Sequence, residues 1–323
     1  MVKRICGEAK LKGIYKIFQL SKPMILKVSL ACVIIIIVSY WKMRLDKLEF
    51  VVKFIYIIGR RKKVEEVKNK KAVVVFLIIT LVLSSICYYI RIRGGDTAAG
   101  MTSILMWCPA VAAFIVQGKF YRKEKVLGWN GCQIKYIMAG IFIPIIYLGF
   151  SYGLYWIVNQ TAFTGEIYIN SIGLLLLLIP SSLLTAAGEE IGWRGFLLPK
   201  LTEIWNVKIA ILISGLIWAV WHFPLMIAGL YQTGTSIWYQ LPMFTIEVVA
   251  MTTIMAYLRL KSKSIWPAII LHASHNYIDQ VICGPLTSAN KQAYFVGETG
   301  LITAFMLIIV AIIVIRKIIH EAL

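Results

Sequence analysis

Charged residues are scarce in this sequence. Asp, Glu, Lys and Arg together make up 15% of its 323 residues, whereas hydrophobic residues make up 59%. Soluble domains carry about 25% charged and about 45–50% apolar residues, so the composition excludes an ordinary soluble protein. Apolar runs with a period of two are also missing, which excludes a transmembrane β-barrel. The class that remains is a membrane protein built from α-helices.

Acidic residues are scarcer still, with 15 Asp and Glu against 34 Lys and Arg and a net charge of +19. In a soluble protein this excess would indicate nucleic-acid binding. Here the basic residues cluster between apolar runs, as the positive-inside rule describes, and no soluble domain remains to carry a nucleic-acid site. We therefore expect the lipid bilayer as a partner, and no nucleic acid. The oligomeric state is not indicated.

Paired cysteine motifs are absent as well. The six cysteines include no CxxC pair, which excludes a disulfide framework or a cysteine zinc site, and the sequence has no HExxH zinc motif.

Nine apolar runs are close to the roughly 20 residues that a membrane-spanning helix needs. They cover residues 24–41, 72–90, 98–116, 134–158, 167–185, 207–230, 237–258, 265–283 and 301–319. They predict an all-α, polytopic membrane bundle of about eight or nine transmembrane helices. Residues 48–59 are too short to cross and are expected at the interface, and residues 60–71 are expected to form a solvated basic loop.

The basic segments indicate an orientation. Residues 60–71, 119–125, 200–208, 259–263 and 316–317 fall on one side if every run from residue 72 onward crosses once. The loops on the other side contain no Lys or Arg, so the basic side and the C-terminus are predicted to be cytoplasmic. The protein is therefore expected in the plasma membrane as a multi-pass protein. The same count places the basic N-terminus outside, a conflict that the sequence leaves open.

Two acids and an arginine directly follow one of these runs, in the stretch AAGEEIGWRGFLLP. A charge near the membrane centre costs at least about 2.5 kcal/mol on insertion scales. Glu190 and Arg194 are spaced i,i+4 and can form an ion pair on one helix face. Glu189 points about 100° away and is free to act as a general base. The alternative is a water-exposed cluster that only caps the helix.

Three of the four histidines lie inside apolar runs, at positions 222, 272 and 275. Ionisable groups in such runs almost always face the bundle interior or a water-filled cavity. His272 and Asn276 share one helix face, and they are predicted to converge with Glu189 and His222 in an intramembrane polar cavity open to the cytoplasm. There the Asn276 amide can donate to a developing oxyanion. The alternative for each histidine is a core residue bonded to a backbone carbonyl.

Two further groups stand beside this set. His275 and Asp279 share another face of their helix and are expected to form a structural or orienting pair. Glu247 is an intramembrane acid that is expected to line the same cavity or to pair with Arg259.

Three motifs then stand in order on three separate runs: EEIGWR at 189–194, WAVWH at 218–222 and HASHN at 272–276. They resemble the EExxxR, FxxxH and HxxxN motifs of the CPBP family, also called the Abi or CAAX-protease family, with Trp218 in place of Phe. These are intramembrane proteases that include the type II CAAX prenyl endopeptidases. The resemblance predicts a protease core over residues 134–283, an N-terminal membrane-anchoring region over 1–133, and a C-terminal helix and basic tail over 284–323.

The resemblance implies an intramembrane endopeptidase, either glutamate-dependent or of the metallo type. Water would be activated by Glu189 and His222, the oxyanion would be stabilised by His272 and Asn276, and the site would be ordered by Glu190 and Arg194. The favoured interpretation requires no cofactor. Zinc held by Glu189, His222 and His272 is the alternative.

The substrate predicted from this resemblance is a membrane-associated peptide or protein. High Ile and Lys usage indicates a low-GC bacterium, which favours a bacterial membrane-associated peptide over a prenylated CAAX tail. Two other functions stay open. One is a non-catalytic membrane immunity or scaffold protein of the same family, and the other is a proton-coupled transporter with a Glu/His relay.

Overall fold

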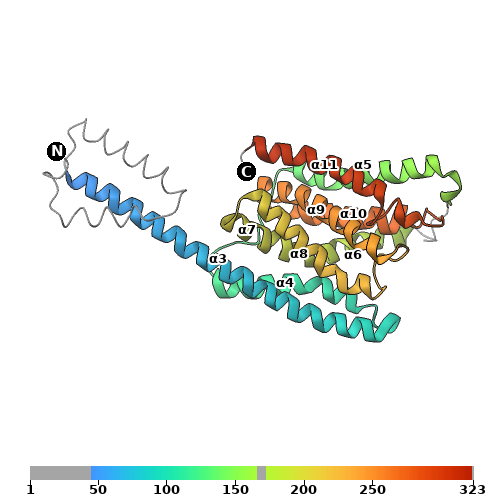
Figure 1. Cartoon of the computed structure of the whole chain (residues 1–323), viewed down its shortest axis with the longest axis horizontal. Coiled ribbons are helices and arrows are strands. Elements are labelled where there is room, and N and C mark those ends of the chain that lie inside the picture. Colours follow the sequence, from blue (N-terminus) through green and yellow to red (C-terminus); the bar gives the residue numbers. More distant parts are fainter. Residues whose placement is uncertain (1–44, 166–171, 322–323) are drawn as a thin grey trace. The chain divides into compact units, whose positions relative to one another are not determined.

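The computed structural model describes residues 45–165 and 172–321, and these are almost entirely helical, which confirms the predicted all-α fold (Figure 1). The α-helices are α3 (Leu45–Gly94), α4 (Met101–Phe120), α5 (Ile134–Val158), α6 (Ile172–Glu190), α7 (Leu198–Ile204), α8 (Val207–Ile227), α9 (Ile237–Ser262), α10 (Trp266–Asn276) and α11 (Leu301–His320). Two π-helices, η4 (Ile191–Leu197) and η5 (Tyr277–Cys283), continue α6 and α10. Short 3₁₀ turns are η2 (Gly95–Ala98), η3 (Gln160–Ala162) and η6 (Gln292–Tyr294).

The chain divides into two compact units, Met1–Glu65 and Glu66–Leu323. In the first unit the structure describes residues 45–65, which form the start of α3. The second unit holds the rest of α3 and all other described helices, and every contact discussed below lies within it.

Helix α3 runs without a break through residues 48–71, so the predicted loop at residues 60–71 is wrong. These residues continue the helix that contains residues 48–59. The basic run is rich in Lys and Glu, which are good helix formers, and Glu66 and Lys70 make an i,i+4 ion pair with Oε1 and Nζ 2.7 Å apart. Most described side chains between residues 63 and 71 are exposed, as predicted.

Seven helical segments of the described chain are long and apolar enough to cross a membrane. They are Lys63–Ala98, Met101–Phe120, Ile134–Val158, Leu175–Ile204, Val207–Ile227, Ile237–Ser262 and Leu301–His320. The predicted run 24–41 lies outside the described residues. The predicted span 265–283 corresponds to α10 and η5, which together form a shorter helix in contact with α5, α6 and α9. Seven spans in the described chain are roughly consistent with the predicted count of about eight or nine.

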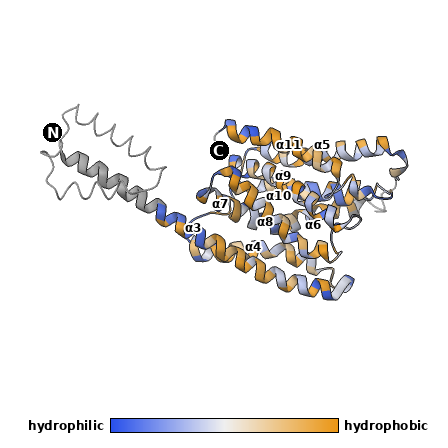
Figure 2. Ribbon diagram, viewed as in Figure 1, coloured by the Kyte–Doolittle hydropathy of each residue, from blue (hydrophilic) through white to orange (hydrophobic). Residues whose placement is uncertain are grey.

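Hydrophobic residues run along these helices (Figure 2). Large apolar side chains such as Ile157, Leu177 and Phe305 are 60–73% exposed. In water such surfaces would be unfavourable, and lipid chains cover them in a membrane.

The two ends of the second unit differ in their loops. At one end, the N–H of Ile265 donates to the carbonyl of Gly128 at 2.8 Å and joins the basic α4–α5 and α9–α10 loops. At the other end, the N–H of Thr164 donates to the carbonyl of Leu286 at 3.0 Å, between segments that lack the clustered basic residues. The basic loops therefore share one end, as the positive-inside pattern predicted.

Two glycines allow the acidic motif to pack closely against α4. A Cβ added at Gly192 would lie 2.3 Å from Cβ of Pro109, and one at Gly188 would lie 2.7 Å from the carbonyl oxygen of Met106. Side chains cannot occupy such positions, so only glycine permits this approach. The helix changes from α to π directly after Glu190, and π-helical turns are rare and frequent at functional sites.

Candidate active site

The motif at the end of α6 forms a fully buried ion pair. Nη1 of Arg194 donates to Oε1 of Glu190 at 2.9 Å, which is the i,i+4 pair predicted from the spacing. Nη2 donates to Oγ1 of Thr252 on α9 at 2.8 Å. The guanidinium also lies over the ring of Trp218 on α8, with Cζ 3.9 Å from the ring centroid. Arg194 therefore joins the motif to both α8 and α9.

The second partner of Glu190 is His272. Its Nδ1 lies 2.9 Å from the same Oε1 that accepts from Arg194. Because a carboxylate only accepts, Nδ1 carries the hydrogen, and Nε2 donates only when the ring is protonated. The predicted convergence of His272 on the acidic motif thus occurs through Glu190. Sequence reasoning missed this bond and had assigned His272 to Glu189.

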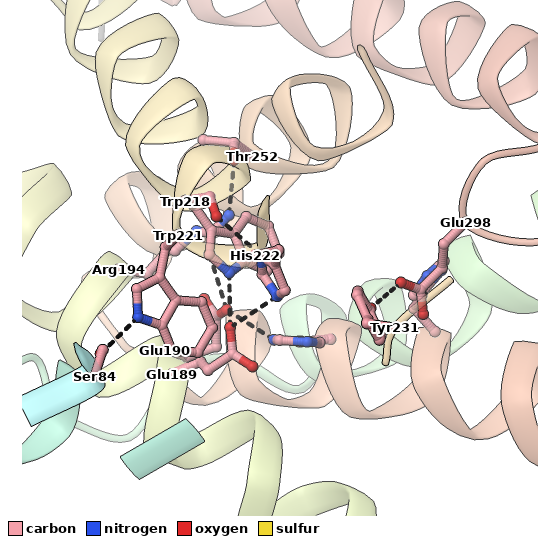
Figure 3. Close-up of polar contacts among 12 residues, drawn as sticks. Ser84, Glu189, Glu190, Arg194, Trp218, Trp221, His222, Tyr231, Thr252 and Glu298 are labelled. Carbon is pink, nitrogen blue, oxygen red and sulfur yellow. Dashed lines mark hydrogen bonds and ion pairs between the residues drawn. The ribbon is translucent and has the colours of Figure 1, made fainter. Parts of the chain in front are cut away.

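Glu189 points in a different direction from Glu190, as predicted. Its Oε2 accepts a hydrogen bond from Nε1 of Trp218 at 2.7 Å (Figure 3). The same oxygen lies 3.9 Å from Nε2 of His222, which is an electrostatic contact too long for a direct hydrogen bond. The Glu189 side chain is only 2% exposed.

His222 presents a free nitrogen to this carboxylate. Its Nδ1 lies 2.9 Å from the main-chain carbonyl of Trp218, so Nδ1 carries the hydrogen and the neutral ring has its lone pair on Nε2, facing Glu189. At 13% exposure the His222 side chain is more accessible than Glu189. Four aromatic rings surround it, with centroids 5.9, 4.8, 5.5 and 5.0 Å away: Trp218, Trp221, Tyr231 and Phe244.

Tyr231, in the loop between α8 and α9, stacks on His222 and donates its hydroxyl to Oε2 of Glu298. Gln280 donates to the other oxygen of Glu298 at 2.6 Å. Burial, and then the Glu298 carboxylate, raise the pKa of Tyr231 well above its usual value, so the phenol keeps its proton at neutral pH. Tyr231 and Glu298 lie in loops outside the three motifs, and no residue pattern indicated their contact.

Asn276 is the last residue of α10, about one turn beyond His272. Its side chain is half-buried. Among the described residues it has no hydrogen-bond partner, so its amide is available to donate to a bound group. The six predicted site residues thus lie in α6–η4, α8 and α10. Contacts join Glu189, Glu190, Arg194, His222 and His272 directly or through Trp218, whereas no hydrogen bond among the described residues joins Asn276 to them.

The expected pairing of His275 with Asp279 is wrong. His275 Nδ1 shares a hydrogen bond with the hydroxyl of Tyr147, and Asp279 accepts from the hydroxyl of Tyr152 at 2.8 Å. Both tyrosines belong to α5. Packing of α10 and η5 against α5 therefore decides the partners of both side chains, and spacing within one helix does not determine it.

Glu247 does not pair with Arg259. The two stand 12 residues apart on α9, about 18 Å along a helix, which is beyond the reach of the side chains. Nε of Arg259 instead donates to the main-chain carbonyl of Arg194 at 3.0 Å. Glu247 is buried at 3% exposure, and its Oε1 has no hydrogen-bond partner among the described residues.

The side chains suggested as zinc ligands do not form a three-ligand group. Within the described chain, no cluster of three or more His, Cys, Asp or Glu side chains has an arrangement that could hold a metal ion. His272 is bonded to Glu190, and Glu189 is bonded to Trp218. This donor set does not fit a catalytic zinc site with three protein ligands, so we derive no step through a metal.

Fold and site together define a polytopic helical membrane protein with a buried carboxylate and histidine centre. A model of the family described as type II CAAX prenyl endopeptidase Rce1-like matches residues 171–278, which include all six predicted site residues. A similar protein is CAAX prenyl protease 2 of Methanococcus maripaludis, with 31% identity over 173 residues.

The aligned part covers 51% of this chain and 59% of that relative, so the chain spans about three fifths of the relative's length. The match to the Rce1-like family model covers the segment that carries all three motifs. The resemblance predicted from the three motifs is thereby confirmed.

Proposed function

We propose that this chain is an intramembrane endopeptidase that hydrolyses a peptide bond in a membrane-associated peptide or protein. The observation that carries the proposal is the pairing of Oε2 of Glu189 with Nε2 of His222, 3.9 Å apart and largely shielded from solvent. A water molecule can reach both groups at hydrogen-bonding distance. The match of this region to a family of endopeptidases supports the same chemistry.

The first step is activation of that water. The neutral His222 ring has its lone pair on Nε2, and Glu189 is an ionisable carboxylate, so one of them takes the proton as the water oxygen attacks the scissile carbonyl carbon. The other keeps the water oriented. A carbon–oxygen bond forms, and the carbonyl oxygen becomes an oxyanion.

The oxyanion is stabilised by donors from α10. The Asn276 amide is one donor, and Nε2 of His272 is a second when that ring is protonated. The adjacent Glu190 carboxylate favours the protonated ring, because Nδ1 is bonded to Oε1. The intermediate then collapses, the carbon–nitrogen bond breaks, and the proton held at the base passes to the leaving amine. Arg194 orders the site by fixing Glu190 against α8 and α9.

This sequence of steps needs no cofactor. We propose a bacterial membrane-associated peptide as the substrate. The relative is named a CAAX prenyl protease. The high Ile and Lys content of this chain favours an unprenylated bacterial peptide as its substrate. The proposed cavity opens to the cytoplasm from a multi-pass protein of the plasma membrane.

The function is tested with purified protein in detergent and a library of membrane-partitioning peptides. Wild type is expected to give defined products by mass spectrometry, and His222→Ala is expected to give none while keeping its melting temperature. If His222→Ala and wild type support the same cellular phenotype and neither cleaves, the immunity or scaffold function is correct. Substrate flux that depends on Glu189 and produces no peptide product would identify a transporter.

The orientation is tested by cysteine labelling. Lys123→Cys lies in the exposed α4–α5 loop, and Thr233→Cys lies in the exposed α8–α9 loop. With a membrane-impermeant thiol reagent on intact cells, Thr233→Cys is expected to be labelled above the parent protein. Lys123→Cys is expected to be labelled only after permeabilisation. The opposite pattern would place the basic loops outside and contradict the proposal.

A further inference from the structure

Trp218 contacts four residues of the site. Its indole Nε1 donates to Oε2 of Glu189 at 2.7 Å, and its ring faces Arg194 at 3.9 Å. Its carbonyl accepts from Nδ1 of His222, and its ring meets that of His272 edge-on with centroids 5.3 Å apart. The side chain is 2% exposed.

This position holds Phe in the motif that the chain resembles, and the difference changes the chemistry. Phe offers a ring to Arg194 but no hydrogen-bond donor, whereas the indole N–H donates and cannot accept. A hydrogen bond to a buried carboxylate is charge-assisted and favours the ionised form. This hydrogen bond is made to Oε2 of Glu189. No hydrogen bond to Oε1 of Glu189 is present among the described residues.

We infer that Trp218 is a positioning residue, whose hydrogen bond to Oε2 holds the Glu189 carboxylate beside Nε2 of His222 for the attacking water. The inference rests on the proposed endopeptidase function. In this arrangement one residue orients both members of the base, because the Trp218 side chain holds Glu189 and the Trp218 carbonyl sets the His222 tautomer. A substitution of the side chain removes the first contact and leaves the second in place.

Other ionisable groups lie near the Glu189 carboxylate. They are Glu190 and Arg194 on its own helix and its continuation, His222 from α8, His272 from α10, Tyr88 from α3 and Tyr231 from the α8–α9 loop. Trp218→Phe leaves all of these groups present. A change in the pH profile of this variant therefore reports the loss of the indole donor.

The first test is the kinetics of Trp218→Phe. We expect kcat to fall by about tenfold with KM unchanged, because one hydrogen bond to a charged group is lost at the base and none to substrate. The acidic limb of the kcat–pH profile is expected to move to higher pH, since the carboxylate loses a donor that favours its ionised form. Trp193→Phe is the matched control. That indole is also buried, and its Nε1 has no hydrogen-bond partner in the described structure.

The second test does not depend on activity. In protein labelled with ¹⁵N-tryptophan, the indole signal missing from Trp218→Phe identifies Trp218. That signal is expected to shift in Glu189→Gln, while the Trp221 signal stays, because Trp221 donates to Ser84 at 2.8 Å. An unmoved Trp218 signal, or wild-type kcat and pH profile in Trp218→Phe, would overturn the inference. If wild type cleaves nothing, the proposed function fails, and the NMR result still decides whether the hydrogen bond exists.

Discussion

Replacing Glu189 by Gln is expected to lower kcat for peptide cleavage by about 10²–10⁴-fold, the usual contribution of a positioned general base. Gln has nearly the same shape and can still accept the hydrogen bond from Nε1 of Trp218, but it cannot take a proton from water at neutral pH. The melting temperature should stay within a few degrees of wild type. Initial rates measured by mass spectrometry, together with thermal melts in detergent, check both expectations.

The control for this variant is Glu66→Gln, which removes a carboxylate from an exposed ion pair on α3. It is expected to keep wild-type kcat. Should Glu189→Gln retain more than about a tenth of the activity, Glu189 is not the base, and the proton acceptor must be sought among the other groups around His222.

Arg194→Leu is expected to give the largest loss of stability in the chain, about 3–5 kcal/mol in the free energy of unfolding. The reason is that Arg194 and Glu190 have no exposed surface, so removing the guanidinium leaves a buried charge on Glu190 that only His272 can partly offset. The hydrogen bond to Thr252 and the contact with the Trp218 ring are lost at the same time. Chemical or thermal unfolding in detergent measures the effect.

Lys70→Ala is the matched control, because it removes a cation from an exposed i,i+4 pair whose side chains are 53% and 46% exposed. Exposed pairs contribute about 0–1 kcal/mol, so this variant should unfold close to wild type. Arg194→Lys is expected to lie between the two, since an ammonium keeps the charge and loses the second directed bond. Equal stability of Arg194→Leu and Lys70→Ala would show that Glu190 is neutral or solvated.

Local spacing predicted the contacts that form within α6 and its continuation η4. The i,i+4 separation was enough to place Arg194 on Glu190, and the 100° step was enough to turn Glu189 away. Apolar runs likewise predicted the spans, because crossing a bilayer demands length and composition that are visible in one sequence. The ordered motifs identified the family for the same segment.

The errors fall where partners come from other helices or where charge was taken as the sign of a loop. His275 and Asp279 bond to Tyr147 and Tyr152 of α5, and spacing within α10 does not reveal these partners. Residues 60–71 were assigned to a loop because of their charge, although Lys and Glu are good helix formers. The bond between His272 and Glu190 depends on how α6 and α10 pack, which spacing within one helix does not determine.

Position 218 already differs from the matching motif in the sequence, because it holds Trp where the motif has Phe. Trp in place of Phe keeps an aromatic ring, so the sequence favoured a conservative change. The structure shows that the added Nε1 makes the only hydrogen bond to Glu189 found within the described residues. A substitution that adds a donor beside a predicted carboxylate should be examined for that bond.

The central claim is that the buried Glu189 and His222 centre activates a water molecule. The most direct measurement is peptide cleavage by purified wild-type protein in H₂¹⁸O, with and without a chelator, and mass spectrometry of the products. The account predicts a new C-terminal carboxylate that carries one ¹⁸O atom, equal yield with chelator, and none with Glu189→Gln. Equal labelled product from Glu189→Gln would contradict the role of Glu189, loss of cleavage with chelator would contradict the metal-free mechanism, and the absence of any product would contradict the endopeptidase assignment.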